Sequence, residues 1–220
     1  MADNVSKICA DHLRECYPGL KSSHAHEVVA AFFGYKSHAA LLADKRHAAD
    51  DVDLAAILIP DESIVADRLR DLKGLPEKLP QAGWLVDNLV RLLLGDGIFE
   101  GEVWDCFDVG EYVMEDYLPA NLNENLEFEL EDIIASTNAI FEEISYDECH
   151  VVEADSGVTV TVLGTYQGYW LEDKDDDAES PEIDLEVTVY LRRCAGRIAF
   201  EEPEVDVVGT LREKSAATVR

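Results

Sequence analysis

The chain has 220 residues, of which 47% are hydrophobic, so it is long enough and apolar enough to bury a core. It contains 47 Asp and Glu residues against 18 Lys and Arg residues, which gives a formal net charge of −29. Nucleic acid and anionic membrane surfaces repel such a polyanion, and this argues against affinity of the whole protein for either.

The compartment follows from what the sequence lacks. No basic stretch followed by an apolar run occurs near Met1, so we expect no signal peptide. No apolar run approaches the roughly 18–20 residues of a membrane span, and we expect no membrane association. The five cysteines show no spacing typical of a disulfide framework, which indicates reduced thiols. Together these features predict a cytoplasmic protein.

Charge is distributed unevenly along the chain. Residues 1–47 hold six Lys and Arg against five Asp and Glu, together with five of the six histidines, so the acidic excess lies in residues 48–220. Such a change in composition indicates separate modules. We predict a small three-helix module at 1–47, a helical connector at 48–80 and an acidic α+β domain at 81–220.

Apolar residues at helical spacing dominate the first part of the chain. A first helix around Val5 is ended by Pro18–Gly19, a second begins at Ser22 or Ser23, and a third begins near Ser37. Further helices are expected at residues 61–72, 84–94, 110–117 and 124–136, and a short strand or helix at 54–59.

The hydrophobic period changes to two from Glu143 onward. Residues 157–163 and 183–191 alternate between apolar and polar side chains, and tight-turn signals separate neighbouring runs. A sheet with one apolar and one polar face is typical of antiparallel pairing. The predicted fold class is therefore α+β, with helices followed by an antiparallel meander.

A zinc site is one candidate for chemistry. Cys9, His12 and Cys16 lie at i, i+3 and i+7 on one helical face, and His24 and His26 follow shortly after, so their side chains could supply four ligands. The spacing matches no common zinc motif. The alternative is that the cysteines are small buried apolar groups and the histidines are surface or capping residues.

A calcium site is the second candidate. Asp173, Asp175, Asp177 and Asp184 fall at positions 1, 3, 5 and 12 of an EF-hand count, but Ala178 stands where that loop requires glycine. The alternative is an acidic hairpin loop exposed to solvent, which we favour.

Acidic clusters recur throughout residues 100–206, whereas no catalytic motif or dinucleotide fingerprint occurs and no cofactor is expected. Ordered carboxylates can imitate the charges of nucleic acid and fill the basic groove of a protein that binds it. We predict a non-enzymatic binding or regulatory protein that acts through its acidic surface on a basic protein or protein complex. The alternative is a small-molecule or metal-dependent enzyme with a pocket between helices and sheet.

One short segment carries a family resemblance. Residues 23–42, SHAHEVVAAFFGYKSHAALL, resemble a helical segment of bacterial proteins of unknown function, which is also attached to some glyoxalase-related proteins. In the latter an aromatic residue and an asparagine follow the glycine turn, where this chain has His38 and Ala39. The resemblance implies a bacterial origin, with a mobile element as one source, and no established activity.

Overall fold

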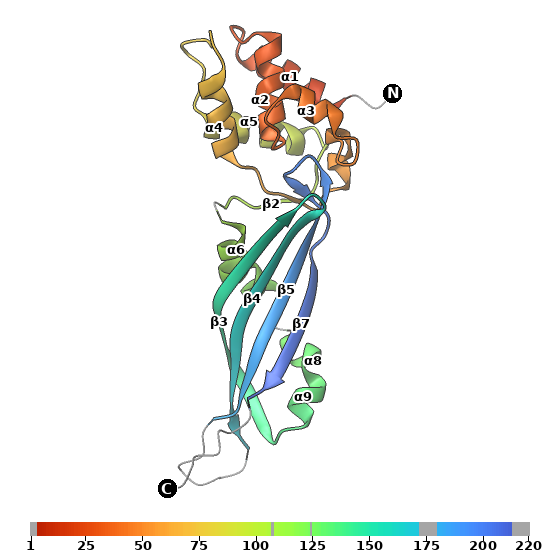
Figure 1. Cartoon of the computed structure of the whole chain (residues 1–220), viewed down its shortest axis with the longest axis vertical. Coiled ribbons are helices and arrows are strands. Elements are labelled where there is room, and N and C mark those ends of the chain that lie inside the picture. Colours follow the sequence, from red (N-terminus) through yellow and green to blue (C-terminus); the bar gives the residue numbers. More distant parts are fainter. Residues whose placement is uncertain (1–3, 107, 124, 172–179, 213–220) are drawn as a thin grey trace. The chain divides into compact units, whose positions relative to one another are not determined.

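The computed structural model describes residues 4–106, 108–123, 125–171 and 180–212 (Figure 1). The fold class is α+β. The chain divides into two compact units. The first comprises residues 1–107, 154–157 and 191–203, and the second comprises residues 108–153, 158–190 and 204–220. No helix within the described ranges combines the length and the apolar character needed to cross a membrane.

The first unit is mainly helical. In chain order its described elements are α1 (Val5–Cys16), α2 (Ser22–Phe32), α3 (His38–Ala43), the 3₁₀ helix η1 (Ala49–Leu54), β1 (Ile57–Leu58), α4 (Glu62–Asp71), α5 (Ala82–Gly95), β2 (Glu102–Val103) and β6 (Ala199–Phe200).

Side-chain caps begin α1 and α3, whereas Lys21 at the start of α2 makes no side-chain capping hydrogen bond. The Asn4 side chain accepts from the Lys7 amide at the start of α1, and the Ser37 side chain accepts from the Ala40 amide at the start of α3. At the end of α2, Gly34 has φ +81°, a conformation that other residues rarely adopt.

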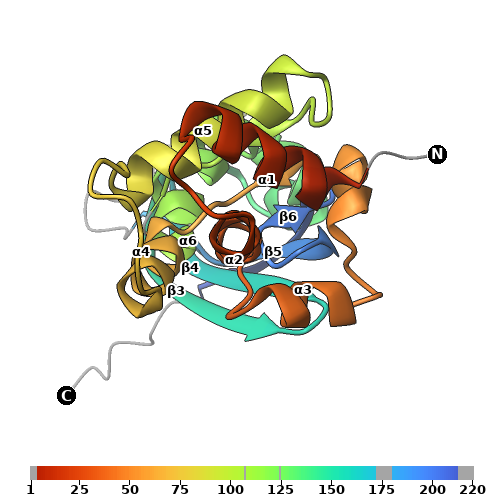
Figure 2. The same cartoon turned by 90° about the horizontal axis from the view of Figure 1, so that it is seen from above.

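Helix α2 is the centre of the first unit. In Figure 2 it is viewed end-on, with α1, α3 and α4 arranged around it. Its face formed by Val28, Val29 and Phe32 is almost completely buried. The core that it shares draws on residues 5–41, 49–65 and 82–99 and on residues 194–199, so segments from all three predicted modules contribute to one core.

The sheet is mixed, which corrects the predicted antiparallel meander. Its order is β2-β1-β6-β5-β4-β3, and β7 also pairs with β5. Strand β1 pairs antiparallel with β6 but parallel with β2. The parallel pair arises because α4 and α5 lie in the long crossover between the two strands, and such crossovers bring the chain back in the same direction.

The second unit places small helices on a long twisted sheet. Its described elements are α6 (Val109–Tyr112), the π-helical turn η2 (Val113–Tyr117), α7 (Leu118–Asn121), α8 (Leu126–Glu129), α9 (Glu131–Ala135), β3 (Ala139–Ala154), β4 (Gly157–Trp170), β5 (Glu182–Ala195) and β7 (Glu204–Leu211). The last residues of β3 and β5 belong to the first unit.

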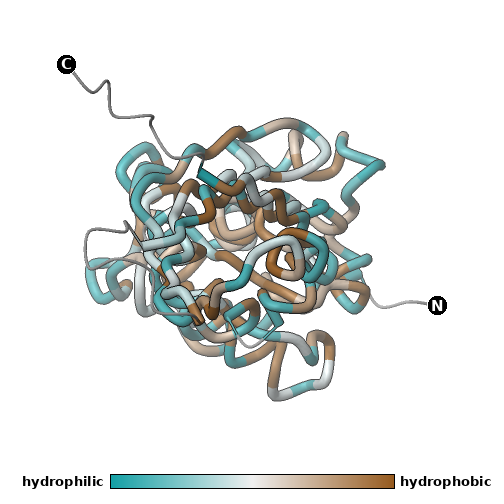
Figure 3. The backbone as a smooth tube through the Cα atoms, turned by 90° about the horizontal axis from the view of Figure 1, so that it is seen from below, coloured by the Kyte–Doolittle hydropathy of each residue, from teal (hydrophilic) through white to brown (hydrophobic). Residues whose placement is uncertain are grey.

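Period-two alternation gives this sheet two different faces. Ile183, Leu185, Val187 and Val189 of β5 are buried, whereas Asp184, Glu186 and Tyr190 between them are exposed. The helices cover the buried face, since a Cβ on Gly209 would meet Leu130 and Ile133 from the α8–α9 segment. Rapid change between hydrophobic and hydrophilic residues along the backbone is visible in Figure 3.

Arg193 stabilises the turn that joins β3 and β4. Its side chain is buried, and Nη1 donates to the carbonyl oxygens of Ala154 at 2.6 Å and Asp155 at 2.9 Å. The guanidinium also lies over the Phe200 ring, 5.7 Å from its centre.

We therefore predict that Arg193→Met lowers the free energy of unfolding by about 2 kcal/mol, since two charge-assisted hydrogen bonds are lost. The matched control is Arg192→Met, whose ion pair with Glu201 is exposed and should change stability by less than about 0.5 kcal/mol. Urea denaturation followed by circular dichroism measures both. Equal losses in the two variants would contradict the assigned role.

Candidate functional site

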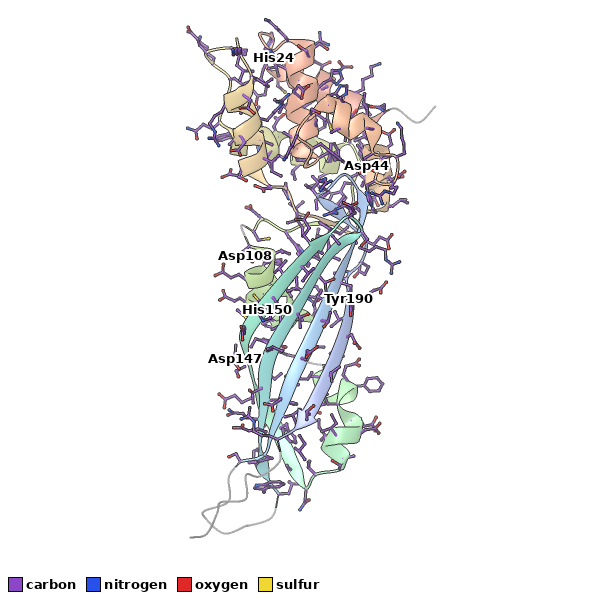
Figure 4. All side chains as sticks on the ribbon, viewed as in Figure 1. His24, Asp44, Asp108, Asp147, His150 and Tyr190 are labelled. Atoms are coloured by element: carbon purple, nitrogen blue, oxygen red, sulfur yellow. The ribbon has the colours of Figure 1, made fainter. Side chains whose placement is uncertain are left out.

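The exposed face of strands β5 and β7 is the candidate site. The two strands run antiparallel with a regular register from Ile183↔Leu211 to Tyr190↔Glu204. Residues directly opposite each other in such a pair project to the same side of the sheet. Asp184, Glu186 and Tyr190 of β5, which are exposed, and Thr188, which is half-buried, therefore share one face with Thr210, Val208, Asp206 and Glu204 of β7. We call these eight residues the acidic face (Figure 4, in which Tyr190 is labelled).

Each cross-strand pair of the acidic face contains one carboxylate. Asp184 and Glu186 lie on β5 opposite Thr210 and Val208, whereas the next two carboxylates lie on β7 opposite Thr188 and Tyr190. Pairs follow each other every two residues, or about 6.8 Å, so the four carboxylates form a row about 20 Å long. No carboxylate stands directly opposite another, which avoids the most repulsive cross-strand arrangement.

Repulsion within the row is still present. Two unit charges about 7 Å apart in water repel by about 0.6 kcal/mol before salt screening. A cation bound along the row relieves this repulsion at several positions at once. A cation already offsets the negative charge at one end of the row, because Arg212 forms ion pairs with both Asp184 and Glu182.

Basic side chains are rare among the described residues of the second unit. No lysine or arginine occurs between Arg91 and Lys174, a stretch that contains 21 Asp and Glu residues. Among the residues of the second unit that the structure describes, Arg212 is the single lysine or arginine. Among these described residues, the negative potential of the acidic face is therefore offset by Arg212 alone.

Two apolar groups interrupt the row of carboxylates. Tyr190 is 43% exposed and Val208 is 53% exposed, and both lie on the acidic face. Alternating charge and exposed apolar surface is what a protein interface requires, because the apolar groups add contact area that ion pairs lack. The sequence predicted the polar side of β5, but the contribution of β7 depends on the register of the pair.

The predicted zinc residues are not assembled into a site. Within the described parts of the chain, no three His, Cys, Asp or Glu side chains form a group that could hold a metal ion. His12 Nε2 lies 2.9 Å from Asn88 Oδ1 and 3.6 Å from Cys16 Sγ. Cys9 is fully buried, and burial raises the pKa of its thiol to about 12, which fits the alternative of a small apolar group.

The predicted calcium residues fall mostly outside the described residues. Asp173, Asp175 and Asp177 lie there, and Asp184 is the acidic-face residue that pairs with Arg212. Cys149 on β3 is a thiol of the second unit. Burial, and then the nearby carboxylates of Asp108, Glu111 and Glu148, raise its pKa, so its thiolate fraction at neutral pH is small.

A pair of histidines that the sequence did not link lies in the first unit. The rings of His26 on α2 and His38 on α3 are stacked with their centres 4.5 Å apart. Beside them, Glu27 accepts from the His38 amide at 3.1 Å and from the Arg68 guanidinium at 2.6 Å. Burial, followed by the proximity of His38, lowers the pKa of His26.

We predict that the pKa of His26, measured by NMR titration, lies below 6.5 and rises in His38→Ala, because a second imidazolium is removed. A lowered pKa means that the unfolded chain binds the proton more readily, so His26 destabilises the fold as the pH falls below about 6.5. His150→Ala serves as the control substitution. An unchanged His26 pKa in His38→Ala would refute the coupling.

Asp44 organises the chain after α3 (labelled in Figure 4). Its carboxylate accepts from the Tyr35 hydroxyl at 2.9 Å and from the backbone amides of Arg46 and His47 at 3.0 and 3.2 Å. Nδ1 of the His47 ring lies 3.4 Å from Asp44 Oδ2. Burial of the carboxyl raises its pKa, but these hydrogen bonds outweigh burial and lower the pKa to about 2. The cluster therefore fixes a loop and contains no partly protonated acid at neutral pH.

We predict that Asp44→Asn lowers the free energy of unfolding by about 2 kcal/mol at pH 7. A carboxyl with a lowered pKa in the folded state stabilises above its unfolded value, near pH 3.8, and loses that contribution as the pH falls through about 2. The difference between wild type and variant should consequently shrink between pH 5 and pH 2. Urea denaturation across this range tests the expectation, and a constant difference would contradict it.

Comparison of the chain with protein-family models, curated proteins and solved structures returns no match. The resemblance of residues 23–42 to a segment of bacterial proteins therefore stays a prediction. Function has to be argued from the chemistry of the acidic face.

Proposed function

We propose that this protein binds a basic segment of another protein through the acidic face of its second unit. The row of four carboxylates, one at each level of the β5–β7 pair, is the observation that carries the proposal. A chain of lysine or arginine side chains can place cations along such a row, in which Asp184 already forms an ion pair with Arg212. Among the described residues of the unit, Arg212 is the single lysine or arginine, and it forms an ion pair with Asp184.

The expected affinity follows from the exposure of the row. Exposed ion pairs contribute about 0.2–1 kcal/mol each, so Glu186, Glu204 and Asp206 provide at most about 3 kcal/mol, which corresponds to a Kd of about 6 mM. Any further binding free energy has to come from contacts with Tyr190 and Val208. The interaction should therefore be moderate in strength and sensitive to salt, as expected for a regulatory contact.

Charge density distinguishes this function from imitation of a DNA duplex. A duplex carries one charge for about every 1.7 Å of its axis, or about 12 charges over 20 Å. The acidic face presents four carboxylates over that length. A flexible basic segment can match this wider spacing, whereas a groove shaped for a duplex would meet too few charges. The proposal accordingly specifies a basic protein segment.

We predict that a short labelled peptide alternating Lys and Val binds the protein, and that raising NaCl from about 50 mM to about 500 mM weakens binding about tenfold. The triple variant Glu186→Gln, Glu204→Gln, Asp206→Asn should weaken binding about tenfold at low salt, since three ion pairs are lost. Fluorescence anisotropy measures both effects.

The matched control neutralises three exposed carboxylates of the same unit outside the acidic face, namely Glu127, Glu129 and Glu131, each replaced by Gln. Its net charge equals that of the first triple variant, yet it should change affinity by less than about threefold. Equal weakening in both triple variants would show that only net charge matters and would defeat the proposal.

A further inference from the structure

We infer that the partner segment adds to the outer edge of β7 as an extra strand, an inference that rests on the proposed function and specifies its binding mode. The occupant is an extended segment in which Lys or Arg alternates with apolar residues. It pairs with residues 204–208, where backbone hydrogen bonds fix its register and the carboxylates select its charge.

The hydrogen-bond pattern between β5 and β7 determines which backbone N–H and C=O groups of β7 can bond to an added strand. The Arg212 amide donates to the Glu182 carbonyl at 2.9 Å, and the register places these two residues opposite each other. In an antiparallel ladder, hydrogen-bonded pairs recur every second residue. The even-numbered residues of β7 thus bond to β5, and the N–H and C=O groups of Val205 and Val207 point away from it.

The outer edge is accessible at these positions. Within the described residues, β7 pairs with no strand other than β5. Val205 is 39% exposed and Val208 is 53% exposed. The α8–α9 segment approaches β7 at Gly209, beyond the segment in question. Residues 204–208 therefore present a strand edge on which the N–H and C=O groups of two residues face outward, and such an edge is a template for pairing with another chain.

The side chains of β7 define the chemistry of the occupant. Residues of an added strand project to the same side as the β7 residues that they oppose. Those on the acidic side meet Glu204 and Asp206, and this position favours Lys or Arg. Those on the other side meet Val205 and Val207, and this position favours apolar residues. Alternation of basic and apolar residues satisfies both sides at once.

A second copy of this chain is a poorer occupant of the same edge. Pairing β7 with β7 brings Glu204 and Asp206 of both copies close together, and like charges on neighbouring strands are repulsive. Charged residues on edge strands commonly prevent self-association in this way. Glu204 and Asp206 therefore disfavour a second copy of this chain as the added strand and favour a basic strand.

The first test uses the wild-type protein and two peptides of identical charge. Both alternate Lys and Val, but one is N-methylated at every Lys and the other at every Val. In an added strand, the N–H groups of every second residue point toward β7, and those of the residues in between point away from it. One methylated peptide should therefore lose about tenfold in affinity, while the other binds as the unmodified peptide does. Hydrogen exchange at the Val205 and Val207 amides should slow on binding of the unmodified peptide.

The second test removes one outward donor from the protein. Val207→Pro eliminates an N–H that does not bond to β5, and proline is accepted at such edge positions, so the strand pair should persist. Affinity for the unmodified peptide should fall about fivefold, whereas the control Val207→Ala, which keeps the N–H, should change it less than about twofold.

The outcomes separate this inference from the proposed function. If both methylated peptides bind like the parent peptide while the acidic-face triple variant still weakens binding, strand addition is wrong and the acidic face stands. If the wild-type protein does not bind the unmodified peptide at all, both are overturned. If sedimentation shows a dimer that Val207→Pro dissociates, a second copy takes the edge and the proposed occupant is wrong.

Discussion

The register between β5 and β7 is the constraint on which the rest of the second unit depends. Because side chains in a strand alternate with a period of two, this one alignment decides three things together. It places the apolar residues of β5 beneath the small helices and gives each cross-strand pair of the acidic face one carboxylate. It also directs the N–H and C=O groups of Val205 and Val207 outward. A slip of one residue would bury Glu186 and expose Val187.

A unit with so much negative charge needs its apolar face to be well covered. Val187 and Val189 are fully buried, as are Leu118 and Leu126 from the helices of the same unit. Burial of this kind contributes about 1.5–3 kcal/mol for each large side chain, whereas each neighbouring carboxylate pair on the surface costs a fraction of that. The unit can therefore tolerate a surface on which negative charge predominates.

The first unit uses its polar groups differently. Asp44 holds the loop after α3, Glu27 joins the α3 amide to Arg68 of α4, and Arg193 fixes the turn between β3 and β4. Each of these charges is satisfied by nearby donors or acceptors, so the contacts restrict local geometry. The acidic face, in contrast, carries carboxylates that are exposed to solvent, of which Asp184 forms an ion pair with Arg212.

Much of the local structure could be predicted from the sequence by itself. The start of a helix near Ser37 could be predicted because a capping side chain acts within a few residues, and the alternation in β5 separates a buried from an exposed face for the same reason. The acidic excess after residue 47 and the α+β class also follow from residue order.

Only the tertiary structure decided the contacts between distant segments. The parallel pairing of β1 with β2, the stacking of His26 on His38 and the position of Glu204 and Asp206 beside β5 all depend on where the chain returns after a crossover or turn. Short strands such as Ile57–Leu58 carry too little periodic signal to reveal a partner, and helical spacing alone does not show that His12 lies beside Asn88. The physical reason is the same in each case: local propensity sets which residues share a face, whereas burial of the whole core sets which faces meet.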